Sequence, residues 1–218
     1  MPSLELRSLG SLEILLDGKP LAGFKTRKAQ ALLIYLAYHA GQSFSREHLQ
    51  TLLWSESAPK QAAASLRQAL ANLRGLLPEG MLRVELGFIA FGGESDYTLD
   101  VAELTTRPQL YRGPFLQGFD IADAQGWEEW LFTTREQIQS RVLDRLEAQG
   151  QAAAAQGHFS AAIESFRQMV RIDSWREDVH RALMRLYDLA GDRAAALAQY
   201  ERCHAILAQE VGVEPTVE

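Results

Sequence analysis

The chain has 218 residues, of which 47% are hydrophobic and 23% charged, and its formal net charge at pH 7 is −6. These values are typical of a globular protein of two ordinary domains or one large one. No apolar run approaches the roughly 20 residues needed to cross a bilayer, and the N-terminal MPSLELRSLG lacks the apolar core of a secretory signal. The single cysteine permits no intrachain disulfide, so the expected location is the reducing cytoplasm.

Charge is unevenly distributed along the chain. Residues 1–105 contain 10 Lys and Arg against 11 Asp and Glu, whereas residues 106–218 contain 12 against 17. Residues 25–75, however, contain seven basic residues and only two acidic ones. The total charge argues against a nucleic-acid partner, for which a basic surface is expected, but a local basic zone can still bind phosphates.

The first elements in chain order are short strands followed by a helix. Apolar and polar residues alternate over residues 4–16, which predicts half-buried strands, and the DGK sequence at residues 17–19 predicts a hairpin turn. A helix is expected from about Thr26 to Ala40, with Thr26 as its N-cap and Gly41 in the left-handed conformation after its end.

Two more helices and a hairpin are expected next. A short helix capped by Ser43 or Ser45 should end near Trp54, and a third helix should run from about Lys60 to Leu77. Alternating apolar residues then predict a hairpin over Leu82–Phe91 and a short strand. Strands, three helices and a hairpin form the order of a winged helix-turn-helix domain with an N-terminal sheet, which we assign to residues 1–105.

The second part of the chain is expected to be all helical after a linker. Residues 106–125 contain two prolines and two glycines and predict a linker, and helix is expected from Gly126 onward. GHFSAAIESF (157–166) matches GDRAAALAQY (191–200) at an offset of 34 residues, the period of tetratricopeptide (TPR) helix pairs. Residues 127–149 are expected to supply earlier helices. We therefore predict an all-α, TPR-like domain over residues 106–218, which makes the expected fold α+β followed by all-α.

The segment SLRQALANLR, residues 65–74, lies on the third helix. At about 100° per residue, one stripe is apolar and faces the core: Leu66, Leu70, Leu73 and Leu77. The opposite side carries Gln61, Ser65, Gln68 and Asn72, with Lys60, Arg67 and Arg74 along one flank. Gln and Asn can pair with adenine, and Arg and Lys with guanine or phosphate. A solvated surface helix remains the alternative, but the absence of acids from residue 60 to 77, the preceding helix and the following hairpin favour a helix that reads DNA.

Basic residues elsewhere are further candidates for DNA contact. Lys25, Arg27 and Lys28 surround the N-terminus of the first helix, where backbone N–H groups and cations can meet a phosphate. The alternative is that they are ordinary solvated charges. Arg83 in the hairpin is a weaker candidate.

Other chemistry is not indicated. The five histidines are scattered without metal-type spacing, and FGGES lacks the lysine and following helix of a phosphate-binding loop. His180 and His204 on helices are expected to be packed or solvated, and Cys203 to lie in the core. We expect no catalytic site, cofactor or metal, and hence no enzyme.

Motifs in both halves of the chain resemble those of a known family. LG.LE…DGKPL, RKAQALL.YLA…G, SREHL…LW and A..SLRQAL..LR resemble the OmpR-type winged helix of SARP-family bacterial regulators. YRGPFLQGF, WEEWL…R and AGDRAAALAQYERC…L..EVGVEPT resemble the bacterial transcriptional activator domain that follows it in that family. The resemblance implies a sequence-specific regulator, usually an activator, which binds direct repeats in double-stranded promoter DNA as adjacent copies and contacts RNA polymerase. The helix 60–77 would enter the major groove and the hairpin 82–91 would be the wing.

The hairpin tip departs from that family pattern. VELGF carries Glu85 where a basic wing is expected, and this motivates an alternative, a protein-interaction or sensor module of a larger regulator with weak or lost DNA binding. The chain ends just after GVEPTVE, where larger relatives continue, so both a short complete member and the N-terminal part of a long one remain open.

Overall fold

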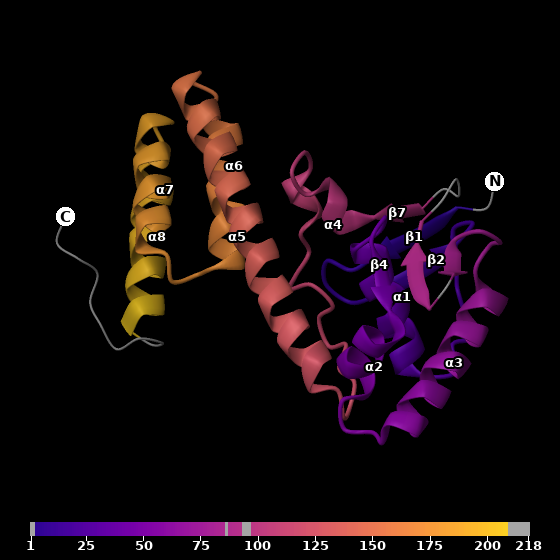
Figure 1. Ribbon diagram of the computed structural model, residues 1–218. Helices are drawn as coiled ribbons and strands as arrows, with labels where there is room; N and C mark the ends of the chain where they lie inside the picture. Colours follow the sequence, from indigo (N-terminus) through magenta and orange to yellow (C-terminus); the bar gives the residue numbers. More distant parts are fainter. Residues whose placement is uncertain (1–2, 86, 93–96, 209–218) are drawn as a thin grey trace. The chain divides into compact units, whose positions relative to one another are not determined.

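The computed structural model describes residues 3–85, 87–92 and 97–208, and it divides into two compact units (Figure 1). Unit 1 is formed from Met1–Leu104 and Leu110–Ile138 and mixes strands with helices. Unit 2 is formed from Thr105–Gln109 and Gln139–Glu218 and is helical where it is described. The expectation of a mixed N-terminal region followed by an all-helical domain is thus confirmed.

A four-stranded sheet opens unit 1. Its strand order is β3-β2-β1-β7, from Lys19–Pro20, Glu13–Leu16, Leu4–Arg7 and Tyr97–Leu99 respectively. β1 is antiparallel to β2 and parallel to β7. Asp17 and Gly18 both have positive φ, 52° and 73°, and they form the two-residue turn between β2 and β3. The hairpin predicted from DGK is therefore confirmed.

Three helices follow: α1 (Arg27–Tyr38), α2 (Arg46–Trp54) and α3 (Pro59–Leu76). The Thr26 hydroxyl accepts from the Ala29 N–H at 3.1 Å, which confirms the predicted cap of α1. Ser45, the second of the two serines considered, caps α2 by accepting from the His48 N–H at 3.1 Å. Pro59 opens α3 at a position where its missing N–H removes no helical hydrogen bond.

The expected hairpin belongs to a second, three-stranded sheet. Its order is β4-β6-β5, from Ser43–Ser45, Phe88–Phe91 and Leu82–Glu85. The hairpin is confirmed by pairs such as Val84 with Ile89. β4 was not predicted, because three residues are too few to show an alternating pattern. Ile89 and Phe91 are fully buried, so this sheet contributes to the core of unit 1.

A single long helix, α5 (Gln125–Ala155), continues from unit 1 into unit 2. It follows the short helix α4 (Asp100–Glu103) and the 3-10 turn η1 (Pro108–Leu110). The expectation of several helices over residues 127–149 is wrong, because this stretch contains neither proline nor glycine and forms part of one uninterrupted helix. The glycines on either side of it, Gly126 and Gly150, lie at closely packed positions. A Cβ on Gly126 would lie 3.2 Å from the Thr51 carbonyl oxygen, and one on Gly150 would lie 2.6 Å from the Phe166 ring.

The 34-residue repeat is visible in the helices of unit 2. α6 (Phe159–Ile172) and α8 (Arg193–Ile206) begin and end 34 residues apart, with α7 (Glu177–Leu189) between them. Gly157 and Gly191 precede them with φ of 74° and 80°.

The two copies of the repeat differ in exposure. Ile163 and Phe166 on α6 are buried, whereas their counterparts Leu197 and Tyr200 on α8 are 59% and 46% exposed. In the described residues, α6 packs beside α7 and also meets α5 through Phe166 and Gly150, whereas the main neighbour of α8 is α7.

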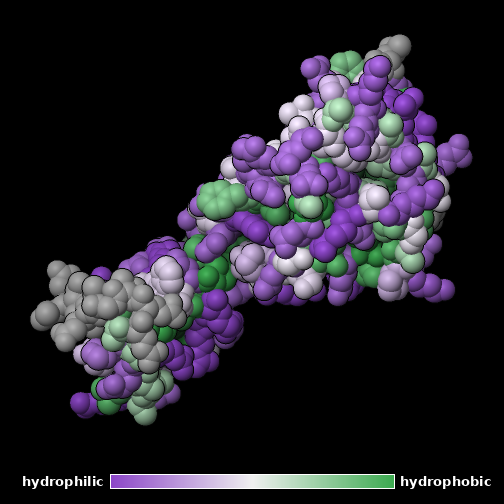
Figure 2. All heavy atoms as spheres, turned by 90° about the horizontal axis from the view of Figure 1, so that it is seen from below, coloured by the Kyte–Doolittle hydropathy of each residue, from purple (hydrophilic) through white to green (hydrophobic). Residues whose placement is uncertain are grey.

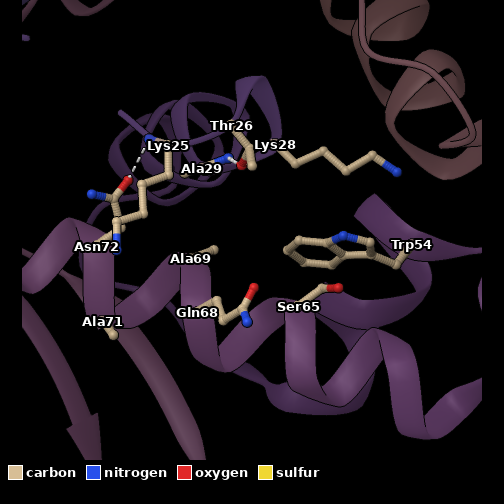
Figure 3. Close-up of a pocket in the computed structure, with 10 residues that line it drawn as sticks. All are labelled: Lys25, Thr26, Lys28, Ala29, Trp54, Ser65, Gln68, Ala69, Ala71 and Asn72. Carbon is tan, nitrogen blue, oxygen red and sulfur yellow. Dashed lines mark hydrogen bonds between the residues drawn. The ribbon is translucent and has the colours of Figure 1, made fainter. Parts of the chain in front are cut away.

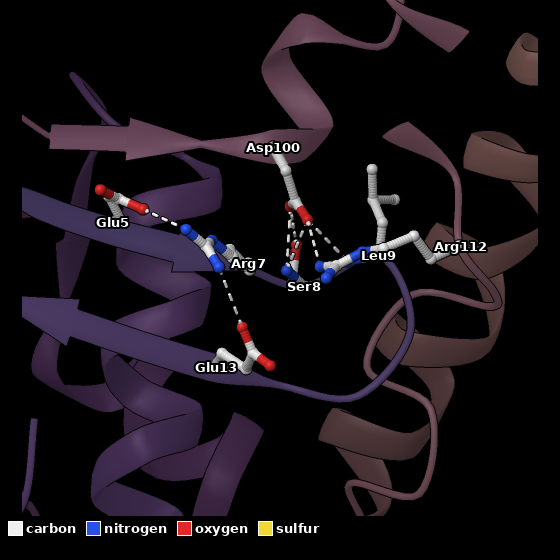
Figure 4. A network of polar contacts seen from close by, with 7 residues as sticks. All are labelled: Glu5, Arg7, Ser8, Leu9, Glu13, Asp100 and Arg112. Carbon is white, nitrogen blue, oxygen red and sulfur yellow. Dashed lines mark hydrogen bonds and ion pairs between the residues drawn. The ribbon is translucent and has the colours of Figure 1, made fainter. Parts of the chain in front are cut away.

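Asp100 joins three segments of unit 1 (Figure 4). Its carboxylate accepts from the Ser8 N–H and hydroxyl and from the Leu9 N–H at 2.7–2.9 Å, and Arg112 lies 3.6 Å away. The Ser8 carbonyl in turn accepts from the Leu116 N–H at 2.7 Å. One carboxylate therefore holds the end of β1 against α4, and the same β1 end holds the segment around residues 112–116.

An aromatic cluster connects α1 to the start of α5 within unit 1. The Trp130 ring centre lies 5.1 Å from that of Tyr35 and 5.6 Å from that of Tyr38, and Trp127 lies 4.8 Å from Trp130. Tyr35 also hydrogen-bonds His48 through its hydroxyl at 2.8 Å. Trp127 and Trp130 thus fix the beginning of α5 through aromatic contacts.

His39, whose ring centre lies 4.7 Å from that of Tyr35 in this cluster, makes stability depend on pH. Burial lowers the pKa of His39 below its usual value of 6.5, and the neighbouring His48 adds to the shift. Because the unfolded chain then binds more protons at this site than the folded one, the contribution of His39 to the free energy of unfolding should be constant above about pH 7.5 and fall as pH drops through 6.5. Urea unfolding at a series of pH values across this range would measure the free energy of unfolding. His39→Phe should flatten this fall, and an unchanged pH profile would contradict the assignment.

No helix in the described part of the chain is long and apolar enough to span a membrane. On the face seen in Figure 2, hydrophilic residues predominate and hydrophobic ones occur in separate patches.

Candidate nucleic-acid interface

Helix α3 has one buried and one open side. The predicted stripe is confirmed, since Leu66, Leu70 and Leu73 are at most 4% exposed and Leu77 is 7% exposed. Five residues predicted to face outward or flank that side are exposed: Lys60, Gln61, Arg67, Gln68 and Arg74. Ser65 and Asn72 are half-buried. The leucines hold the helix to the core, and its polar side remains accessible.

Apart from Asn72, the polar side chains on this open side have no internal partner among the described residues. Among the described residues, no hydrogen bond or ion pair is formed by the side chains of Lys60, Gln61, Ser65, Arg67, Gln68 and Arg74. No acid lies between residues 60 and 77 to neutralise the cations. These donors and acceptors are therefore available to an external ligand rich in phosphates and polar edges.

A cavity of about 420 Å³ lies beside this side of α3 (Figure 3). Ser65, Gln68 and Asn72 enter it from α3, Lys25, Thr26 and Lys28 come from the start of α1, and Trp54 closes one end. Trp54 was expected only as the end of the second helix. Its place in the wall depends on the packing of α2 against α3, which residue spacing within one helix does not reveal.

Asn72 is already engaged inside the protein. Its side-chain oxygen accepts from the Lys25 N–H at 2.9 Å, and its side-chain nitrogen donates to the Gly23 carbonyl at 3.1 Å. Both polar atoms of the amide thus bind the segment that enters α1, which distinguishes Asn72 from Gln61 and Gln68.

The three cations near the start of α1 have different surroundings. Arg27 donates to the Gly118 carbonyl at 3.2 Å and lies over the Phe119 ring at 4.9 Å. Lys28 donates to the Asp123 carbonyl at 3.0 Å and lies 5.9 Å from the Trp54 ring centre.

The remaining cation, Lys25, is exposed, and its ammonium has no partner among the described residues. Burial lowers the pKa of Lys28, against the opposing effect of Asp123 and Glu56. Lys25 is therefore the most available of the three cations.

Arg83 lies apart from this group on the second sheet. It lines a separate hollow together with Ser43, Glu85, Phe88 and Ala90. Arg83 and Glu85 are both exposed strand residues on this face, so the hollow carries charges of both signs. This surface is less favourable to a polyanion than the open side of α3.

No group of three or more His, Cys, Asp or Glu residues able to hold a metal ion occurs in the described residues. Cys203 is buried, as predicted, and burial raises the pKa of its thiol. His180 is also buried and packed: its ring nitrogens contact the Ser174 carbonyl at 3.0 Å and the Gln199 side chain at 2.6 Å. Both side chains are therefore packed in the protein interior, as expected for residues that stabilise the fold.

Comparison with known proteins identifies related bacterial regulators. The structure superimposes on "Mycobacterium tuberculosis EmbR in complex with low affinity phosphopeptide" with a TM-score of 0.69 and 26% identity, covering 100% of this chain and 63% of that one. The sequence is 25% identical to the transcriptional regulatory protein EmbR of Mycobacterium tuberculosis over 97% of this chain. It is 27% identical to the regulatory protein AfsR of Streptomyces coelicolor over 98% of this chain.

The fold and these relatives define the class as bacterial regulators with a mixed N-terminal region and a helical second region. The family model of the bacterial transcriptional activator domain matches residues 94–218. The chain belongs to this family and, with it, to the SARP-family regulators. It spans 60% of the length of EmbR and 23% of that of AfsR.

Proposed function

We propose that the protein is a sequence-specific DNA-binding transcriptional regulator that inserts α3 into the major groove. The observation that carries this proposal is the open side of α3, where Lys, Gln and Arg side chains have no partner among the described residues and no acidic residue lies between positions 60 and 77. Helices α1–α3 followed by the β5–β6 hairpin support a winged helix-turn-helix assignment for residues 1–105. The hairpin would be the wing, with Arg83 as its cation.

Roles within the interface follow from side-chain chemistry. Gln61 and Gln68 suit base edges, Arg67 suits a guanine edge, and Ser65 can bind either base or phosphate. The remaining exposed cations suit phosphates: Lys25, Lys60 and Arg74. Arg27 and Lys28 would contribute mainly through the positive electrostatic potential that they create, since each already donates to a backbone carbonyl.

Residues 106–218 would form a TPR-like activator domain that contacts other proteins, RNA polymerase among them. The 34-residue spacing of α6 and α8 supports the repeat assignment. We propose that the protein acts in the cytoplasm as an activator, with two copies side by side on direct repeats and without a catalytic step.

Footprinting of the purified protein on the DNA upstream of its own gene tests this function. We expect protected repeats about one helical turn apart at about 150 mM salt, resistant to excess non-specific DNA. Binding that disappears under these conditions would contradict the proposal.

That negative result would favour a second function, a protein-interaction or sensor module. Glu85 in the hairpin and the net charge of −6 motivate this reading. The solved structure of EmbR contains a phosphopeptide. Binding of a phosphopeptide by the present protein is therefore the first alternative to measure.

Exposed apolar residues on α8 give a prediction for the activator role. Leu197 and Tyr200 are 59% and 46% exposed, and large exposed apolar side chains often mark protein interfaces. The double change Leu197→Ser and Tyr200→Ser should lower transcription from a target promoter at least about fivefold while DNA affinity stays unchanged. Ala194→Ser, also exposed on α8, is the control. Equal transcription by the double variant and this control would exclude this face as the partner surface.

A further inference from the structure

The contact between Asn72 and the segment before α1 has the form of a backbone pairing. The Gly23 carbonyl and the Lys25 N–H flank Phe24, and the Asn72 amide supplies one donor and one acceptor to them. Because a backbone N–H can only donate and a carbonyl can only accept, these partners also fix the orientation of the amide. A single side chain thus makes to this segment the pair of hydrogen bonds, one donated and one accepted, that a neighbouring backbone would make.

A second contact, one turn further along α3, supports the same docking. Gly23 has φ of +97°, and a Cβ on it would lie 2.9 Å from the Leu76 side chain. The segment therefore lies against α3 at both Asn72 and Leu76, with a glycine where the approach is closest.

This docking fixes the position of the Lys25 backbone, from which its side chain extends. The next residue, Thr26, is the N-cap of α1, so residues 23–26 are held by α3 on one side and by the helix cap on the other. Arg27 and Lys28 are bonded to the Gly118 and Asp123 carbonyls, which leaves Lys25 as the available cation next to α3.

We propose that Asn72 is a positioning residue for DNA binding: it reads no base, and instead holds Lys25 at a fixed distance from α3 so that a phosphate and the base edges are contacted together. This rests on the proposed function. It predicts that Asn72 affects affinity through the phosphate contact of Lys25, whereas Gln68, on the same side without an internal partner, affects the choice of base.

The test is a double-mutant cycle of Asn72→Ala and Lys25→Ala, measured on the footprinted site and on variants of each base pair. Each single change should weaken binding on the order of threefold to tenfold on all sequences alike and lower the salt slope by roughly one. The double variant should bind about as well as Lys25→Ala alone, because the contact is already lost. Gln68→Ala is the matched control and should relax preference at one base pair with the salt slope unchanged.

Additive losses in the cycle, or relaxed preference at one base pair for Asn72→Ala, would overturn the proposal. Hydrogen exchange of the Lys25 amide in the full chain without DNA checks the contact itself, and Asn72→Ala should accelerate it at least tenfold with global unfolding unchanged. Unchanged exchange would also overturn the proposal. If the unmodified protein binds no specific site, the proposed function fails and the DNA role of Asn72 with it. The exchange result then shows separately whether the contact exists.

Discussion

Asp100→Ala should destabilise the protein by about 3 kcal/mol, the largest stability effect we expect from a single polar residue here. The substitution leaves the Ser8 and Leu9 N–H groups and the Ser8 hydroxyl without an acceptor. Ser8 is fully buried, so its N–H and hydroxyl have little access to water in place of the lost carboxylate. Asp100→Asn keeps one acceptor oxygen but no charge, so it should lower the stability less than Asp100→Ala does.

Urea unfolding followed by tryptophan fluorescence measures this loss, since Trp54, Trp127 and Trp130 all belong to unit 1. The matched control is Glu13→Ala, which removes a carboxylate from an exposed ion pair with Arg7 on the same sheet. It should change stability by less than about 0.5 kcal/mol. Equal effects of the two substitutions would show that the Asp100 contacts contribute no more than a surface pair.

Local patterns predicted the helices well. The leucine stripe of α3, the Thr26 cap and the DGK turn depend on residues within one or two turns of each other, and each is confirmed. The 34-residue repeat was also visible, since two copies of one helix pattern suffice to define it.

Contacts between distant residues were not predictable from one sequence. Asn72 bonds a segment 47 residues earlier, and Arg27 bonds a carbonyl 91 residues later. A helical projection places Asn72 opposite the leucine stripe, but it contains no information about the loop that packs there, and Asn72 is half-buried against that loop. For the same reason, the parallel pairing of β1 with β7 and the wall formed by Trp54 emerged only from the structure.

The double change Arg67→Ala and Gln68→Ala should strongly weaken specific DNA binding while leaving the fold intact. Each lost base contact is worth about 1–3 kcal/mol, so the pair should lower affinity for the specific site on the order of 100-fold or more. Both side chains are exposed and form no bond within the described residues, so stability should change by less than about 0.5 kcal/mol. Fluorescence anisotropy with labelled site DNA at about 150 mM salt measures the affinity.

The decisive comparison is between specific and non-specific DNA. Loss of base contacts should remove the preference for the site, while Lys25, Lys60 and Arg74 still support weak, salt-dependent binding to any sequence. Glu79→Ala is a suitable control, because this exposed acid lies just beyond α3 and outside its open side. Retained preference for the specific site in the double variant would mean that α3 is not the reading element. The interface would then have to be sought on the β5–β6 hairpin, whose mixed charges already make it the weaker candidate.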